Sequence, residues 1–225
     1  MWIRADGGAE PLPLTRDDTH RGQTPASVSP DGRFVLITRQ GMGAQSLTID
    51  TSDPDHPKAG ATEPLLNTSA IVGGTISPDG RWLAYTFVAS GTVQVFVRPF
   101  ANGKIAGSGA WQISAAGGAY PVWSRAARQL LYATSEGRIK VVDYAVEGDS
   151  FHDLKPRLWT DKQIGTITGG IPFGLGRLFD LTPDGRRIIA WEPEDQPKEA
   201  KVDLHVTMLL NWFDELRRRL PPYGK

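Results

Sequence analysis

A tetrapeptide recurs along the chain and constrains its fold more than any other feature. The strong copies are Ser29-Pro30-Asp31-Gly32, Ser77-Pro78-Asp79-Gly80 and Thr182-Pro183-Asp184-Gly185. Each follows an apolar residue and precedes one or two arginines and an apolar run typical of a β-strand. Proline presets φ at the first corner of a turn, aspartate accepts bonds from nearby backbone, and glycine takes the positive φ that closes it. The motif therefore predicts a β-hairpin that returns about every fifty residues.

A fourth copy of the hairpin is degenerate. The segment from Trp123 to Arg128 aligns with the segment from Ile76 to Arg81, and Leu130 then falls under Leu83. Ala126-Ala127 stands where the other copies have Asp-Gly. We interpret this as decay of the turn residues while the flanking strands were kept.

Each repeat is predicted to contain four short strands. In the second repeat these are Ile71 to Ile76, Trp82 to Val88, Val93 to Phe100 and Trp111 to Ser114. The fold class is therefore all-β: a β-propeller of about four blades of four antiparallel strands, since a β-sandwich would not repeat itself. Two polar, proline-rich segments, Thr51 to Pro64 and Pro193 to Lys201, are predicted as mobile surface loops. The stretch Gly165 to Gly176 is predicted as an insertion in the last interval.

The two ends of the chain define the expected domains. Residues 1–210 are predicted to form the propeller blades, with an incomplete first blade, and residues 211–225 a short carboxy-terminal helix and tail. Asn211 can cap that helix, and Trp212 should pack against the last blade. Either the amino-terminal strand completes the last blade, or blades are missing upstream and the chain is part of a larger propeller. We favour the larger propeller, because four-bladed rings are uncommon.

Composition excludes several kinds of partner. Lys plus Arg and Asp plus Glu each number 25, so the formal net charge is zero, which gives no electrostatic case for nucleic acid or an anionic membrane surface. There is no Cys, which excludes disulfides and thiolate chemistry. The apolar runs are far shorter than a membrane span. We expect no nucleic acid partner and no membrane contact by this chain.

The residues that a catalytic or metal-site hypothesis would use have simpler interpretations. Aspartates 31, 79 and 184 precede glycine in each turn, so they and the glycines are interpreted as turn-forming residues: Asp31, Gly32, Asp79, Gly80, Asp184 and Gly185. The segment Asp53-Pro54-Asp55-His56 lacks calcium-loop spacing and is interpreted as a solvated loop. Trp82, Trp123 and Trp212 are predicted to pack between blades. No catalytic, cofactor-binding or metal-binding residue is assigned.

These segments resemble a known family. The repeated Ser-Pro-Asp-Gly-Arg and its following strand resemble TolB-like and WD-repeat-like propellers. From about Gln23 to the end, the chain resembles the carboxy-terminal propeller of bacterial eukaryotic-type serine/threonine protein kinases. The segments that carry this likeness are Ser77 to Tyr85, Val95 to Phe100, Trp111 to Ser114, Trp123 to Arg125 and Leu210 to Arg218. The resemblance implies a position on the extracytoplasmic side of a bacterial membrane.

The kinase motifs themselves are absent from the sequence: there is no His-Arg-Asp loop, Asp-Phe-Gly or glycine-rich phosphate loop. We therefore expect a non-catalytic sensor or scaffold that binds a protein, a peptide or a small ligand on one propeller face, with no cofactor. Two alternatives stay open. One is a metal-dependent propeller enzyme of the lactonase or lyase type, and the other is a truncated remnant of a longer protein.

Overall fold

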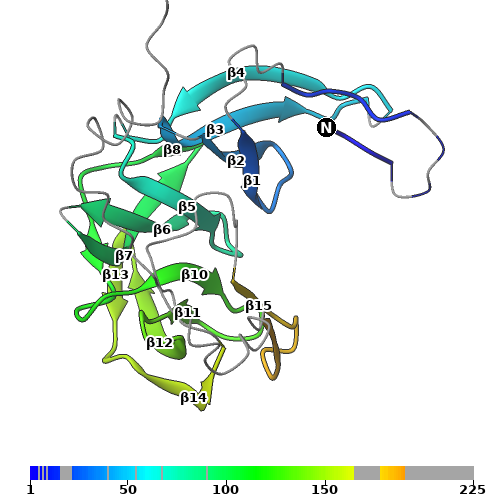
Figure 1. The fold of residues 1–225 in the computed structure, drawn as a ribbon. Coiled ribbons are helices and arrows are strands. Elements are labelled where there is room, and N and C mark those ends of the chain that lie inside the picture. The colour runs from blue at the N-terminus through cyan, green and yellow to red at the C-terminus, as the bar shows by residue number, and fades with distance from the viewer. Residues whose placement is uncertain are drawn as a thin grey trace, which may run out of the picture. The chain divides into compact units, whose positions relative to one another are not determined.

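The chain folds into successive antiparallel sheets that follow one another in chain order (Figure 1). The computed structural model describes residues 1–4, 6, 8, 10–15, 22–39, 41–53, 55–66, 68–89, 91–164 and 178–190. These belong to one compact unit, Met1–Glu192. Four predictions lie outside the described residues: the carboxy-terminal helix, the packing of Trp212, the insertion Gly165 to Gly176 and the loop Pro193 to Lys201.

The described strands form four sheets. The first contains β1 (Gln23–Val28), β2 (Phe34–Arg39), β3 (Gly43–Asp50) and β4 (Lys58–Pro64). The second contains β5 (Ile71–Ile76), β6 (Trp82–Ala89), β7 (Thr92–Ala101), β8 (Lys104–Ile105) and β9 (Trp111–Gln112). The third contains β10 (Ala119–Trp123), β11 (Gln129–Ala133), β12 (Arg138–Glu147), β13 (Ser150–Asp153) and β14 (Arg157–Gln163). The fourth contains β15 (Phe179–Leu181) and β16 (Ile188–Ala190).

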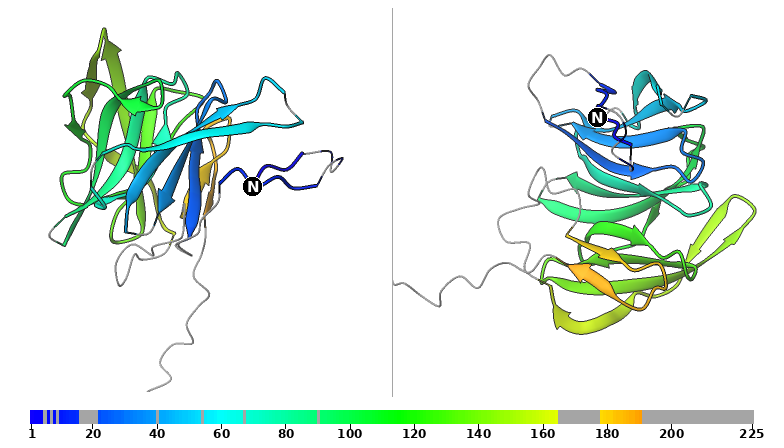
Figure 2. Two further views of the ribbon diagram at one scale, coloured as in Figure 1. Left: turned by 90° about the horizontal axis from the view of Figure 1, so that it is seen from above. Right: turned by 90° about the vertical axis from the view of Figure 1, so that its right-hand side faces the viewer.

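The predicted all-β class and the blade pattern are confirmed. Every strand pair within the sheets is antiparallel, with β9 paired to β7 and β14 paired to β12, and the described residues contain no helix. The register also confirms the alignment of the degenerate repeat, because Trp123 lies opposite Leu130 as Ile76 lies opposite Leu83. Figure 2 shows the sheets side by side in two further views.

The hairpin turn has the same hydrogen bonds in its three strong copies. In the second sheet, the Ser77 N–H donates to the Trp82 carbonyl (2.8 Å) and the Gly80 N–H donates to the Ser77 carbonyl (2.9 Å). The Asp79 carboxylate accepts from the Ser77 hydroxyl (2.5 Å) and from the Arg81 N–H (3.1 Å). Gly80 has φ +75°, which an L-residue rarely adopts. The first and fourth sheets repeat this pattern.

The degenerate turn uses a different set of bonds. The Ser124 hydroxyl accepts from the N–H groups of Ala126 (3.2 Å) and Ala127 (3.3 Å), in the place of the missing carboxylate. Ala127 is not among the residues with positive φ, so the turn geometry differs where the glycine is lost. The strands on either side still pair, because the Ser124 N–H donates to the Gln129 carbonyl at 2.9 Å.

One predicted loop is wrong. The segment Thr51 to Pro64 was expected to be a mobile loop, yet Lys58–Pro64 forms β4, which pairs with β3 from Gln45↔Pro64 to Asp50↔Lys58. The strand is almost wholly exposed and its sequence is polar. An outermost strand is held through backbone hydrogen bonds and needs no apolar face, so hydrophobic periodicity does not reveal it.

Two long strands extend over the preceding sheet, a feature absent from the sequence prediction. The end of β7 turns back at Asn102-Gly103 to pair with β8, and the end of β12 turns back to pair with β13. We call these two hairpins the β7–β8 ribbon and the β12–β13 ribbon. A Cβ on Gly103 would lie 2.5 Å from the Phe34 ring of the first sheet, so the β7–β8 ribbon is in close contact with that ring. From the second sheet, Arg81 Nη2 donates to the Gly148 carbonyl (2.6 Å) in the β12–β13 ribbon.

Apolar clusters fill the spaces between sheets. Between the second and third sheets, Trp82 (1% exposed) contacts Phe151 of the β12–β13 ribbon at 5.2 Å between ring centroids. Trp123 lies in the same cluster and stacks edge-on against Tyr144 at 5.2 Å. Leu36 and Leu83 belong to the cluster between the first two sheets, and Leu131 belongs to the one that reaches the fourth. Each inner sheet is therefore buried on both faces.

Two glycine substitutions should distinguish the free energy lost through backbone strain in a turn from that lost through a collision at the ribbon contact. Gly80→Ala places a side chain at φ +75°, where the new Cβ would make only an ordinary contact with Pro30 at 3.7 Å, and we expect it to lower the free energy of unfolding by about 1–2 kcal/mol. Gly103→Ala has the same strain at φ +76° and adds a collision with the Phe34 ring, so its loss should be larger. Urea unfolding of both variants measures the difference.

The matched control is Gly22→Ala, since no atom lies within 4 Å of its Cβ position and its φ is not positive. This change should leave the unfolding free energy nearly unchanged. Equal losses for Gly80→Ala and Gly103→Ala would contradict the ribbon contact.

Candidate functional site

The inner strands of all four sheets line one cavity of about 940 Å³, which we call the axial cavity. Strand β5 contacts β1 and β10, and β10 contacts β15, so the first strands of the sheets lie side by side around it. The lining residues are Pro25 to Pro30, Thr75 to Pro78, Val122, Trp123, Arg125, Asp180, Leu181 and Pro183. Its volume is at the upper end of what small-molecule sites occupy.

Equivalent positions of the four repeats form two levels of the axial cavity. The last residue of each inner strand supplies an apolar side chain: Val28, Ile76, Trp123 and Leu181. The second residue of each turn forms the rim of the cavity. This residue is proline in the first, second and fourth turns (Pro30, Pro78 and Pro183), but it is Arg125 in the third. The cavity thus has an apolar level beneath a rim of three prolines and one guanidinium.

Polar bonds between sheets close the wall of the cavity. The Ile76 N–H of β5 donates to the Ser27 hydroxyl of β1 at 3.1 Å. The Trp123 indole N–H of β10 donates to the Thr75 carbonyl of β5 at 3.0 Å. Strand β5 is therefore bonded to the sheet on either side of its own, which fixes the spacing of the inner strands.

Two charged side chains line the axial cavity. Arg125 is exposed and makes no ion pair with any other described residue. Asp180 is exposed on β15, and its Oδ1 accepts the Leu181 N–H at 2.8 Å. From the sequence alone, Arg125 is only one residue of a degenerate turn, and no motif distinguishes Asp180. The signal that could have found Arg125 is its place in the alignment, where the other copies have proline.

The aspartates of the three strong turns are occupied in their own hairpins. The Ser29 hydroxyl, and then the N–H and guanidinium of Arg33, lower the pKa of Asp31 below its usual value. The Thr182 hydroxyl, and then the Arg186 N–H, lower the pKa of Asp184 in the same way. Asp79 accepts the corresponding bonds in the second turn, and none of the three lines the axial cavity.

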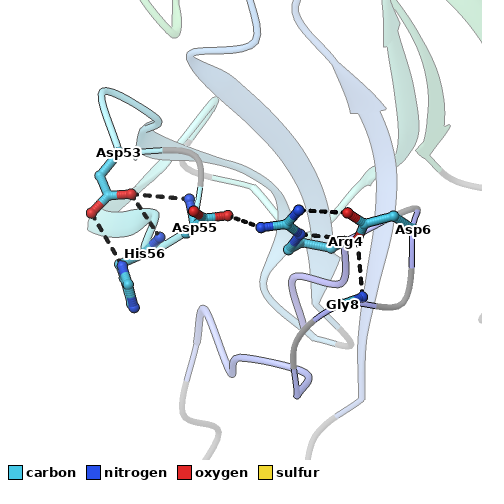
Figure 3. A network of polar contacts seen from close by, with 6 residues as sticks. All are labelled: Arg4, Asp6, Gly8, Asp53, Asp55 and His56. Carbon is cyan, nitrogen blue, oxygen red and sulfur yellow. Dashed lines mark hydrogen bonds and ion pairs between the residues drawn. The ribbon is translucent and has the colours of Figure 1, made fainter.

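The Asp53 to His56 segment lies in a polar network with the amino-terminal segment (Figure 3). Arg4 pairs with both Asp6 and Asp55, which connects the amino terminus to the connection between β3 and β4. Asp53 accepts the Asp55 N–H at 3.0 Å and pairs with His56 Nδ1 at 3.1 Å. Among the described residues, no group of three or more His, Cys, Asp or Glu side chains could hold a metal ion.

A second cavity, of about 430 Å³, lies beside the connection from β9 to β10. Glycines, alanines, one valine and uncharged polar residues line it: the set is Gly91 to Gln94, Ala115 to Ala119 and Ser135. It offers less chemistry for recognition than the axial cavity, which therefore is the stronger candidate.

Tyr120 occupies a strained position on the inner strand β10. Its φ is +54°, which is rare for a bulky residue, and the equivalent residue of β5 is Gly73 at φ +69°. Both lie where the pairing register shifts. Tyr120 is only 6% exposed and its hydroxyl has no hydrogen-bond partner, and burial raises the pKa of Tyr120 to about 12.

Removing that hydroxyl should stabilise the fold. Tyr120→Phe eliminates a buried polar group without a partner, and we expect the free energy of unfolding to rise by about 1 kcal/mol. Tyr120→Ala keeps the strained φ and opens a cavity, so it should lose about 3 kcal/mol or more. A loss in the Phe variant, measured by urea unfolding, would show that the hydroxyl has a stabilising partner.

The carboxylates of the turns should make the free energy of unfolding depend on pH. Because the folded pKa values of Asp31 and Asp184 are lowered, their contribution is present above the unfolded pKa of about 4 and is lost as the pH falls through the folded values. The double variant Asp31→Asn, Asp184→Asn should lose less stability between neutral and acid pH than the parent. Urea unfolding measures the free energy of unfolding across that pH range. The control is Asp153→Asn, because Asp153 is exposed at the end of β13. An unchanged pH dependence in the double variant would contradict a stabilising role of the two turn carboxylates.

Comparison with known proteins supports the fold. No family model and no curated protein matches the chain. A candidate 6-phosphogluconolactonase from Bacteroides uniformis superposes with a TM-score of 0.51 at 19% identity, over 84% of this chain and 55% of that one. TolB from Acinetobacter baumannii matches with a TM-score of 0.43 at 12% identity, over 76% of this chain and 37% of that one.

The first likeness supports a β-propeller architecture and, at that identity, concerns the fold alone. The chain spans about half the length of the propellers that it matches, or less. Within its described part, no helix is long and apolar enough to cross a membrane.

Proposed function

We propose that this protein is a non-catalytic binding module whose ligand occupies the axial cavity. The observation that carries the proposal is the lining of the cavity by equivalent residues from all four sheets, with two charged side chains among them. A propeller presents such a site on a rigid frame, and the cross-sheet bonds from Ser27 and Trp123 hold it open without ligand. The ligand is a peptide segment of a partner protein or a small molecule that enters at the proline rim.

The site chemistry supports binding over catalysis. The turn aspartates are occupied in hydrogen bonds of their own hairpins and lie outside the cavity lining, which contains a single carboxylate, that of Asp180. The metal-dependent lactonase or lyase alternative would require a cation held by side chains that converge on the cavity. Elemental analysis of the purified protein discriminates the two functions, and a stoichiometric metal together with turnover of a lactone would refute the binding module.

We further propose that the module belongs to a receptor-like serine/threonine kinase as its carboxy-terminal, extracytoplasmic part. The support is the resemblance of the Ser77 to Tyr85 and Leu210 to Arg218 segments to such propellers. The coding sequence upstream of Met1 tests this context. An in-frame kinase domain followed by a membrane helix supports it, and an unrelated gene directly upstream contradicts it.

Filling the axial cavity should abolish binding. Val28 lines the cavity, is 58% exposed and ends β1, so Val28→Trp adds bulk at the site with little effect on the core. A random twelve-residue peptide library is selected against the parent protein, and a selected peptide is titrated by fluorescence anisotropy. We expect Val28→Trp to weaken its binding by at least about tenfold, or 1.4 kcal/mol.

The matched control is Leu158→Trp, because Leu158 is also apolar and exposed (47%) but lies on the outer strand β14. This variant should bind as the parent does. Selection of no peptide above background, or equal weakening in both variants, would overturn the axial cavity as the binding site for peptides.

A further inference from the structure

The third turn departs from the other three at the position that faces the axial cavity. Proline lines the rim in the first, second and fourth turns, and Arg125 lines it in the third. Proline at this corner favours the turn itself, so its replacement removes a conformational advantage. The exchange therefore requires an explanation other than turn stability.

Packing accounts for one neighbour of Arg125 but not for Arg125 itself. A Cβ built on Gly185 would lie 3.1 Å from the Ala126 side chain, so the third and fourth turns are in close contact there. A small residue at position 126 suits that contact. Arg125, in contrast, is exposed and makes no hydrogen bond or ion pair with a described residue.

The arginines of the first two strong turns are engaged away from the cavity. Arg33 lies over the Phe34 ring (5.8 Å to the centroid), and Arg81 lies over the Trp82 ring (5.9 Å). Arg81 also bonds to the β12–β13 ribbon through the Gly148 carbonyl. Neither lines the axial cavity, where Arg125 is the single cation among the lining residues.

We propose that Arg125 makes the axial cavity a site for an amphiphilic anion, a ligand with one carboxylate or phosphate group and an apolar body. This inference rests on the proposed function and names the ligand chemistry. The guanidinium offers a planar fork of donors that matches carboxylate and phosphate oxygens. The ligand's apolar body lies against Val28, Ile76 and Leu181. Arg125 is the single cation among the lining residues, so the ligand has one anionic group.

Four probes with one apolar body test the head group: octanoate, octyl phosphate, octylamine and octanol. Isothermal titration calorimetry measures each against the parent protein. Octanoate and octyl phosphate should bind about tenfold or more tightly than octanol, since a charge-assisted hydrogen bond contributes about that ratio. Octylamine should bind more weakly than the two anions. The ratio of octanoate to octyl phosphate distinguishes a carboxylate from a phosphate ligand.

Two variants of the same turn isolate the guanidinium. Arg125→Pro restores the residue of the other three turns and should remove the preference for anions while octanol binding stays. Arg125→Gln keeps a flexible polar side chain without the positive charge and should do the same, which guards against a misfolded turn. Arg128→Ala is the matched control, because Arg128 is exposed on the same turn but does not line the cavity.

The outcomes separate this inference from the proposed function. If Val28→Trp abolishes binding of all probes while Arg125→Pro changes nothing, the axial cavity binds ligands and the anion assignment is wrong. Equal affinities for the four head groups, or equal losses in Arg125→Pro and Arg128→Ala, would also overturn it. So would the absence of octanoate and octyl phosphate binding at millimolar concentration.

Discussion

Apolar contact between neighbouring sheets is the constraint on which the rest of this structure depends. Strand β6 sends Trp82 and Ala84 towards the third sheet and Leu83 and Tyr85 towards the first, and all four are nearly inaccessible. A sheet that is apolar on both faces cannot be stable alone in water, because it needs a neighbour on each side. In the fourth sheet, Ile189 takes the place that Ala84 has in the second, and its side chain is 72% exposed, so no described residue covers this face at that position.

The same stacking creates the axial cavity. Each sheet begins with its inner strand, so packing the sheets face to face brings the first strands together, and the edge of each that has no strand partner faces the cavity. The Ser27 and Trp123 side chains satisfy two backbone groups of β5, and the remaining space is the cavity. The cavity is therefore a product of the architecture, and its chemistry depends on which side chains stand at a few repeated positions.

Repetition explains why much of the fold could be predicted. Pro-Asp-Gly between two β-runs favours a tight hairpin turn. Its recurrence therefore predicts the number of repeats, the pairing register at each turn and the inner strand that precedes it. Strand β4 was missed because Lys58–Pro64 is polar and exposed and is held by backbone pairing alone. The ribbons were missed because β8 and β13 are short and act on another sheet, as Gly103 does against Phe34. Long-range contacts of this kind leave no periodic signal in a single chain.

The candidate site was harder to predict for a related reason. In a repeat protein, residues that all copies share are explained by folding, as the turn aspartates and glycines are here by their hydrogen bonds and positive φ. A recognition site requires asymmetry, because a ligand without the symmetry of the repeat cannot contact all copies alike. Departures from the repeat are therefore where specificity can reside. Arg125, a cation among prolines, is such a departure, and its meaning becomes visible only when the four inner strands are placed around one cavity.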